Sequence, residues 1–118
     1  MQINSINNSN FGARFMDNPA TQHALAKLKE TCISRGLSPQ LYERELSKIH
    51  KIFPSDDVMV SLSNKSGIYQ DNVYYTIGIK QGNNFDTDSI FVTSKDTKYT
   101  IAKVISACKK IAERMAGK

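Results

Sequence analysis

Hydrophobic residues recur at helical spacing in the first half of the chain, at every second position in the middle, and at helical spacing again near the end. Spacings of three and four place side chains on one face of a helix, whereas strict alternation places them on one face of a strand. The pattern predicts an α+β fold with the order helix–helix–strand–strand–strand–helix. Consecutive strands with short connections pair antiparallel, so we expect a three-stranded antiparallel meander covered by the C-terminal helix.

Two predicted helices open the folded part of the chain, and each is introduced by a polar residue followed by proline. Asn18-Pro19 and Ser38-Pro39 give this signal, because Asn and Ser cap helix N-termini and proline is tolerated at the first helical position. Gly36 is expected to end the first helix, and Pro54 the second. The predicted apolar stripes are Leu25, Leu28 and Cys32 in the first helix and Tyr42, Leu46, Ile49 and Phe53 in the second.

Three strands are predicted between residues 58 and 94. Gly78, inside the second strand, predicts a bulge, with a close approach of another backbone or a ligand as the alternative. The Asn- and Asp-rich stretch at 83–88 predicts a turn rather than a calcium loop, because the distal glutamate of such a loop is missing. The first strand has Val58, Val60 and Leu62 on one face, the second has Val73, Tyr75, Ile77 and Ile79 on one face and Tyr74, Thr76, Gly78 and Lys80 on the other, and the third runs from Ser89 to Ser94.

Residues 97–118 form a predicted amphipathic helix that carries most of the excess positive charge. Residues 98–118 sum to +5, whereas the strand region 55–97 sums to −3. This polarity fits a polyanion, an acidic protein surface or self-complementary association, and the preference of helix C-termini for cations also explains part of it. The apolar face of this helix comprises Ile101, Val104, Cys108, Ile111 and Met115, and cations on its other faces include Lys103, Lys110 and Arg114.

Length and composition indicate the domain organisation and the cellular compartment. The 118 residues, 40% of them hydrophobic and 23% charged, indicate a single compact domain at 18–118 preceded by a flexible Asn-rich arm at 1–17. No apolar run reaches the roughly 18–20 residues that cross a bilayer, and the N-terminus lacks the features of a secretory signal. Cys32 and Cys108 are expected to be buried free thiols. Together these features predict a cytoplasmic protein without membrane contact.

Candidate catalytic and metal-binding residues are few. His23 and Cys32 lie over two turns apart on one predicted helix, so that helix cannot bring them together. A pair between His50 and Cys108 has no support in the local sequence. Zinc sites draw two ligands from one short element, and no two His or Cys residues are spaced in this way. The sequence therefore predicts no enzyme, no cofactor and no metal site.

From Ser38 to Met115 the order of elements resembles that of the double-stranded RNA-binding domain. Ser94-Lys95 is similar to the family's entry into its basic helix. Where the family continues with a lysine run, this chain has Asp-Thr-Lys-Tyr at 96–99. Where the family's loop between the first two strands carries a Gly-Pro-x-His-type motif, this chain has Gly-Ile-Tyr-Gln at 67–70. The resemblance implies contacts with the backbone of RNA or DNA.

These features favour a small non-enzymatic interaction protein, of adaptor or inhibitor type, that binds another protein. Nucleic-acid binding is the alternative, and self-association is a third possibility. The stretch at 10–14, Asn-Phe-Gly-Ala-Arg, is similar to leaders of small bacterial or phage proteins, which implies such a source. The expected interaction residues are Lys103, Lys110 and Arg114 on the last helix, or Tyr74 and Lys80, which share a strand face that can stack a base or anchor a protein.

Overall fold

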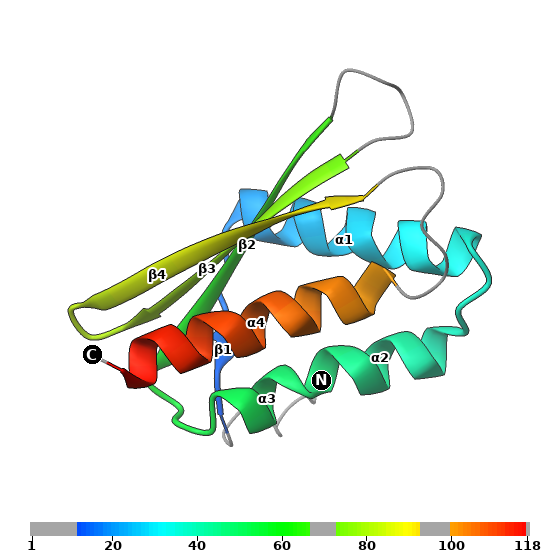
Figure 1. Ribbon diagram of the computed structural model, residues 1–118. Helices are drawn as coiled ribbons and strands as arrows, with labels where there is room; N and C mark the ends of the chain where they lie inside the picture. The colour runs from blue at the N-terminus through cyan, green and yellow to red at the C-terminus, as the bar shows by residue number, and fades with distance from the viewer. Residues whose placement is uncertain (1–11, 67–72, 93–99, 118) are drawn as a thin grey trace.

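The structure is a computed structural model that describes residues 12–66, 73–92 and 100–117. Its helices lie on one side of a sheet (Figure 1), which confirms the predicted α+β class. In chain order the elements are β1 (Arg14–Phe15), α1 (Pro19–Ser34), α2 (Pro39–Ser47), α3 (Ile49–Ile52), β2 (Val58–Ser66), β3 (Val73–Gln81), β4 (Asn84–Val92) and α4 (Thr100–Ala116).

The sheet has four strands in the order β1-β2-β3-β4. β2, β3 and β4 pair antiparallel and form the predicted meander. β1 pairs with β2 in parallel and makes the sheet mixed, so the prediction of three antiparallel strands was wrong in this respect. A strand of two residues is too short to show the alternation that identifies strands, and β1 therefore leaves no signal in the sequence.

β1 comes from the end of the segment assigned to the N-terminal arm, whose residues 1–11 lie outside the described residues. The N–H of Ala13 donates to the carbonyl oxygen of Phe53 at 2.9 Å. Gly12 has a φ of +135°, and a Cβ at this position would lie 2.8 Å from the carbonyl oxygen of His50. Only glycine combines this backbone conformation with so close a contact. The chain from Gly12 onward is thus packed against the domain.

The predicted capping signals begin both N-terminal helices. The side chain of Asn18 accepts a hydrogen bond from the N–H of Thr21 at 2.8 Å, and the hydroxyl oxygen of Ser38 accepts one from the N–H of Leu41 at 3.2 Å. Each bond satisfies a backbone donor that the first helical turn leaves without an intrahelical partner. The second predicted helix is divided at Lys48 into α2 and the short α3.

β4 begins at Asn84 rather than at Ser89, so most of the predicted turn at 83–88 is strand. Asp is disfavoured in strands because its side chain competes for backbone hydrogen bonds. Here the carboxylates of Asp86 and Asp88 lie 2.9 and 3.9 Å from the guanidinium of Arg114 in α4. This tertiary contact is not visible in the local sequence. The predicted continuation of the strand to residue 94 lies outside the described residues.

The helices cover the sheet in two layers. α1 packs against β2, α4 packs against β4 and β3, and α2 and α3 pack against α4. Figure 1 shows α2 and α3 on the side of α4 that faces away from the sheet. The C-terminal helix therefore packs on the sheet as predicted. Its other side packs against α2 and α3.

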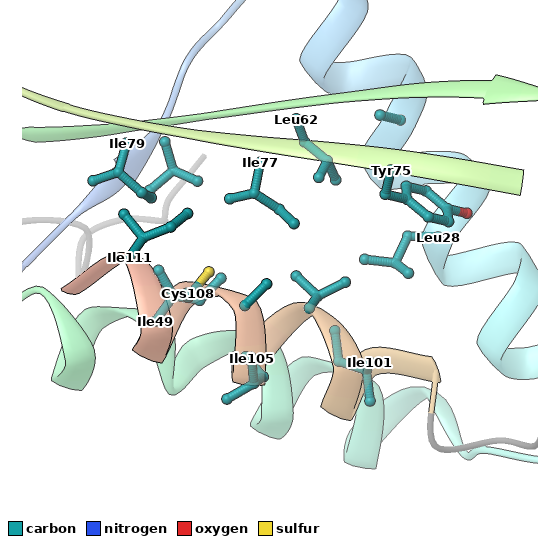
Figure 2. Packing of buried hydrophobic residues seen from close by; sticks show 14 of the residues in the cluster. Leu28, Ile49, Leu62, Tyr75, Ile77, Ile79, Ile101, Ile105, Cys108 and Ile111 are labelled. Carbon is teal, nitrogen blue, oxygen red and sulfur yellow. The ribbon is translucent and has the colours of Figure 1, made fainter. Parts of the chain in front are cut away.

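The core lies between the sheet and the layer formed by α1 and α4. Figure 2 shows Ile77 and Ile79 of β3 pointing toward Cys108 and Ile111 of α4, and all four side chains are completely buried. Burying one such isoleucine stabilises the fold by about 1.5–3 kcal/mol. Other buried members of this core include Leu28, Cys32, Tyr42, Ile49, Val58, Val60, Leu62, Tyr75, Ile101 and Val104.

Candidate functional site

The face of the sheet opposite the helices, here called the outer face, is the candidate site. In β3 the buried residues alternate with exposed ones, so that Tyr74, Thr76 and Lys80 point away from the helices. The strand register brings residues of the neighbouring strands to the same face. By this register the outer face comprises Arg14, Met59, Ser61, Ser63, Lys65, Tyr74, Thr76, Gly78, Lys80, Phe85, Thr87, Ser89 and Phe91.

Three large aromatic side chains remain exposed on the outer face. Tyr74 and Phe91 are register partners whose ring centroids lie 4.5 Å apart. Their exposed fractions are 45% and 38%, and that of Phe85 is 56%. Apolar side chains that gather on one exposed surface mark interaction sites, because solvating them costs free energy that a partner can recover. The outer face is therefore suited to bind another molecule.

Gly78 lies in the middle of the outer face, and strand pairing continues through it on both sides, to Ser61 and to Thr87. The predicted bulge was therefore wrong, and the groups that approach this glycine are side chains rather than the backbone or ligand of the alternative. A Cβ at Gly78 would lie 2.5 Å from the hydroxyl oxygen of Ser61 and 3.4 Å from the ring of Phe85. The aromatic ring of Phe85 thus covers the glycine and replaces the packing that a side chain would give.

Positive charge accompanies these rings. In the register, Lys80 is paired with Met59 of β2 and with Phe85 of β4, and Lys65 is paired with Tyr74. At the described strand positions of the outer face, the charged residues are Lys or Arg and none is Asp or Glu. The two predicted residues of β3, Tyr74 and Lys80, thus share the outer face. Phe85 is missing from the sequence-based prediction because the third strand was predicted to begin only at Ser89. Phe91 lies within the predicted strand, but it is not among the expected interaction residues.

Two of the cations predicted on the C-terminal helix lie along the edge of β4, away from the outer face. Nε of Arg114 lies 2.9 Å from Oδ2 of Asp86, and an Nη atom of Arg114 donates to the carbonyl oxygen of Thr87 at 2.8 Å. The hydrogen bonds to Asp86 raise the pKa of Arg114 above its ordinary value. Nζ of Lys103 donates to the carbonyl oxygen of Phe91 at 3.2 Å. Both side chains therefore bind the protein's own strand.

The third predicted cation of this helix, Lys110, is exposed and lines a groove between β4 and α4. The groove has a volume of about 290 Å³. The structure thus separates the five predicted interaction residues into two sets, one on the outer face and one beside the edge of β4. The groove is lined by Asp88, Ser89, Ile90, Phe91, Lys103, Ser106, Ala107 and Lys110.

The cysteines are free thiols in the core, where they are inert. Burial raises the pKa of both thiols, that of Cys108 to about 12, so they remain protonated at neutral pH and lack the reactive thiolate. Nδ1 of His50 is buried without a hydrogen-bond partner. Across residues 12–66, 73–92 and 100–117, no group of three His, Cys, Asp or Glu side chains is placed to hold a metal ion. Over the same ranges, no helix has the length and apolar character to span a membrane.

No family model, curated protein or solved structure matches the chain. The positions at which the sequence was compared with the double-stranded RNA-binding domain, 67–70 and 94–99, lie outside the described residues. The chemistry of the outer face is that of its own side chains. These side chains offer aromatic contact area, hydroxyl groups and positive charge, all of which can contact a bound molecule.

Proposed function

We propose that the protein is a small non-enzymatic interaction protein, of adaptor or inhibitor type and of bacterial or phage origin, that binds another protein through the outer face. The observation that carries the proposal is the exposure of Tyr74, Phe85 and Phe91 on one uncovered sheet face. Aromatic residues dominate binding energy at protein interfaces because they bury a large area with few rotatable bonds.

The outer face is also ordered before any partner arrives. Its side chains stand on paired strands, Tyr74 packs against Phe91, and the hydroxyl groups of Thr76 and Ser89 lie 3.1 Å apart in a hydrogen bond. A preorganised surface loses less conformational entropy on binding than a flexible loop does. The surrounding serine and threonine hydroxyls can bond polar groups at the rim of an interface.

The positive charge of the outer face restricts the kind of partner that can bind there. Arg14, Lys65 and Lys80 contribute cations to the outer face, and its described positions hold no carboxylate. A second copy stacked face to face would bring these like charges together, which opposes association. A partner with an apolar patch bordered by Asp and Glu complements both the rings and the cations. The proposed partner is therefore a different protein with an acidic surface.

The test compares two variants in affinity capture from an extract of the organism that encodes the protein. The outer-face variant carries Tyr74→Ser and Phe85→Ser. The control carries Leu41→Ser, which removes a side chain of similar exposure, 41%, from α2. We expect one protein to be captured by the wild type and by the control but not by the outer-face variant. With that protein purified, the affinity should fall about 30-fold or more in the outer-face variant.

Equal capture by the outer-face variant and the control would refute the outer face as the binding surface. Thermal unfolding of all three proteins serves as the check on folding. The midpoints of the two variants should stay close to that of the wild type, because both changes lie at exposed positions. Capture that disappears after nuclease treatment would instead favour a nucleic acid as the bound molecule.

Nucleic-acid binding is the second candidate, because exposed aromatic rings and cations on a sheet can also stack bases and contact phosphates. The same three cations and the absence of carboxylates from the described outer face favour it. This function predicts an affinity that falls steeply with salt, since each neutralised phosphate releases counterions. A gel shift with a mixed-sequence RNA at two salt concentrations tests it. No shift at low salt with micromolar protein would exclude it.

A further inference from the structure

The edge of β4 is the second unusual surface of this molecule. In an antiparallel strand, the N–H and C=O groups of alternate residues point to opposite sides. The carbonyl oxygens of Thr87 and Phe91 accept hydrogen bonds from α4, so the odd-numbered residues of β4 direct their main-chain groups outward, away from β3. An outward row of this kind can pair with a further strand unless something closes it.

Part of this row is closed by the protein's own side chains. The N–H of Thr87 donates to Oδ1 of Asp86 at 2.8 Å, and the N–H of Ser89 donates to Oδ1 of Asp88 at 2.9 Å. The guanidinium of Arg114 donates a hydrogen bond to the carbonyl oxygen of Thr87. Beyond this point, the carbonyl group of Ser89 and the N–H of Phe91 have no hydrogen-bond partner among the described interactions.

The opposite edge of the sheet is closed along the first part of β2, as far as the N–H of Leu62. β1 pairs with β2 at Met59 and Val60. The next outward donor, the N–H of Leu62, is bound by the hydroxyl oxygen of Thr21 in α1 at 3.3 Å. Thr21 is buried to 1% exposure, so α1 shields this bond from water. Further along β2, the main-chain groups of Asn64 also point outward, and no described hydrogen bond closes them. The open stretch of β4 around Ser89 and Phe91 has a second feature, since it lines a groove.

The open stretch forms one wall of the groove between β4 and α4. On the helix wall, Ser106 and Ala107 are small and leave room beside the strand, while Lys103 and Lys110 add positive charge. Asp88 is the acidic residue among the lining residues, and its carboxylate already lies 3.9 Å from Arg114. The groove therefore combines unused main-chain groups with an excess of cations.

We propose that this groove accepts an extended acidic segment of a protein partner, which adds to the sheet as a strand beside β4. Its main chain pairs with the carbonyl oxygen of Ser89 and the N–H of Phe91. One of its carboxylates lies against Lys110. Strand addition of this kind takes affinity from main-chain hydrogen bonds and specificity from alternate side chains. The proposal is independent of the outer face, because it uses different groups.

The size of the groove sets the length of the segment. Its strand wall runs from Asp88 to Phe91, which corresponds to about 13 Å of extended chain and so to about four residues of an added strand. Side chains of the segment alternate between the groove and the outer side. Those that enter the groove must be of modest size to fit beside Ala107 and Ile90. A segment that alternates valine and glutamate meets these requirements.

The test uses a fluorescein-labelled heptapeptide that alternates valine and glutamate between terminal threonines, and the same peptide with lysine in place of glutamate. Binding is followed by fluorescence anisotropy against the full-length protein. We expect the acidic peptide to bind and the lysine peptide not to bind. Methylating the central backbone nitrogens of the acidic peptide should abolish binding, because a methylated nitrogen cannot donate to the strand.

Lys110→Gln and Lys109→Gln form a matched pair of variants. Both residues are exposed on α4, but only Lys110 lines the groove. Glutamine is preferred to glutamate at 110, since a carboxylate there would lie one turn from Arg114 and compete with Asp86. Lys110→Gln should weaken the acidic peptide about three- to tenfold, and Lys109→Gln should leave its affinity within about twofold.

The proposal is overturned if the acidic peptide fails to bind, if it binds equally well after backbone methylation, or if the two glutamine variants bind it alike. The outer-face variant with Tyr74→Ser and Phe85→Ser should bind the peptide as the wild type does. Loss of peptide binding in that variant would place the peptide on the outer face and would also refute the groove. The two binding surfaces can thus fail separately.

Discussion

Both faces of the sheet carry large side chains, but those of the inner face are buried and those of the outer face remain exposed. On the inner face, Tyr75, Ile77 and Ile79 of β3 are at 0% exposure and pack against α1 and α4. On the outer face, Tyr74 of the same strand is 45% exposed. Successive residues of a strand point to opposite sides of the sheet. The nine residues of β3 are therefore divided between the core and the outer face. Substitutions at neighbouring positions should therefore separate stability from binding.

The largest expected effect is on the inner face. Ile77→Ala should lower the free energy of unfolding by about 2–5 kcal/mol, because it leaves a cavity in a packed core. Tyr74→Ala, three positions away, should cost about 1 kcal/mol or less, since the side chain is half exposed and loses chiefly its contact with Phe91. Urea denaturation of both variants measures the difference. A similar cost at both positions would show that the outer face is part of the stabilising core.

The second prediction concerns how the stability of the buried core depends on pH. Burial raises the pKa of the Cys108 thiol from an ordinary value of 9.0 to about 12. Between these values the unfolded chain loses this proton and the folded chain keeps it, so alkaline pH favours unfolding. The stability present below pH 9 should be lost as the pH rises toward 12, by at most about 1.4 kcal/mol per pH unit for this one group.

Cys108→Ala tests this assignment, since it removes the ionising thiol. The plot of unfolding free energy against pH should become shallower between pH 9 and 11 than in the wild type, whatever stability the variant loses at neutral pH. Burial also raises the pKa of Cys32, Tyr42 and Tyr75, and these groups contribute to the slope that remains. Parallel plots for the two proteins would mean that the thiol meets solvent in the folded state.

The smallest expected effect concerns the cations. Arg114→Gln removes the contacts with Asp86 and Thr87 and should lower the thermal midpoint slightly, with a smaller difference at high salt. Lys80→Gln, on the outer face, should leave the midpoint unchanged. Differential scanning calorimetry at two salt concentrations compares them. A drop for Lys80→Gln equal to that for Arg114→Gln would contradict the division between cations that hold the fold and cations that bind a partner.

Much of the fold could be predicted because its signals are local. The two N-cap and proline pairs, the alternation in β2 and β3, and the apolar face of the last helix depend on residues within a few positions of one another. The inner and outer faces of β3 follow from this alternation alone. The alternation therefore predicts that Tyr74 and Lys80 share one face of the strand.

What could not be predicted depends on contacts between distant residues. β1 is held by β2 and by the fit of Gly12 against His50. The start of β4 is held by Arg114, which lies 28 positions from Asp86. For the same reason the sequence could not show that Lys103 and Arg114 bind the strand edge. The sequence shows that a helix carries positive charge, but the fold decides which group each charged side chain contacts.

Phe91 belongs to both proposed surfaces, since its ring packs with Tyr74 while its main chain borders the groove beside α4. If an occupant of one surface displaces Phe91, it changes the affinity of the other surface, and the second occupant then changes the affinity of the first by the same factor. A protein of this size can in this way make one binding event conditional on another without any moving domain.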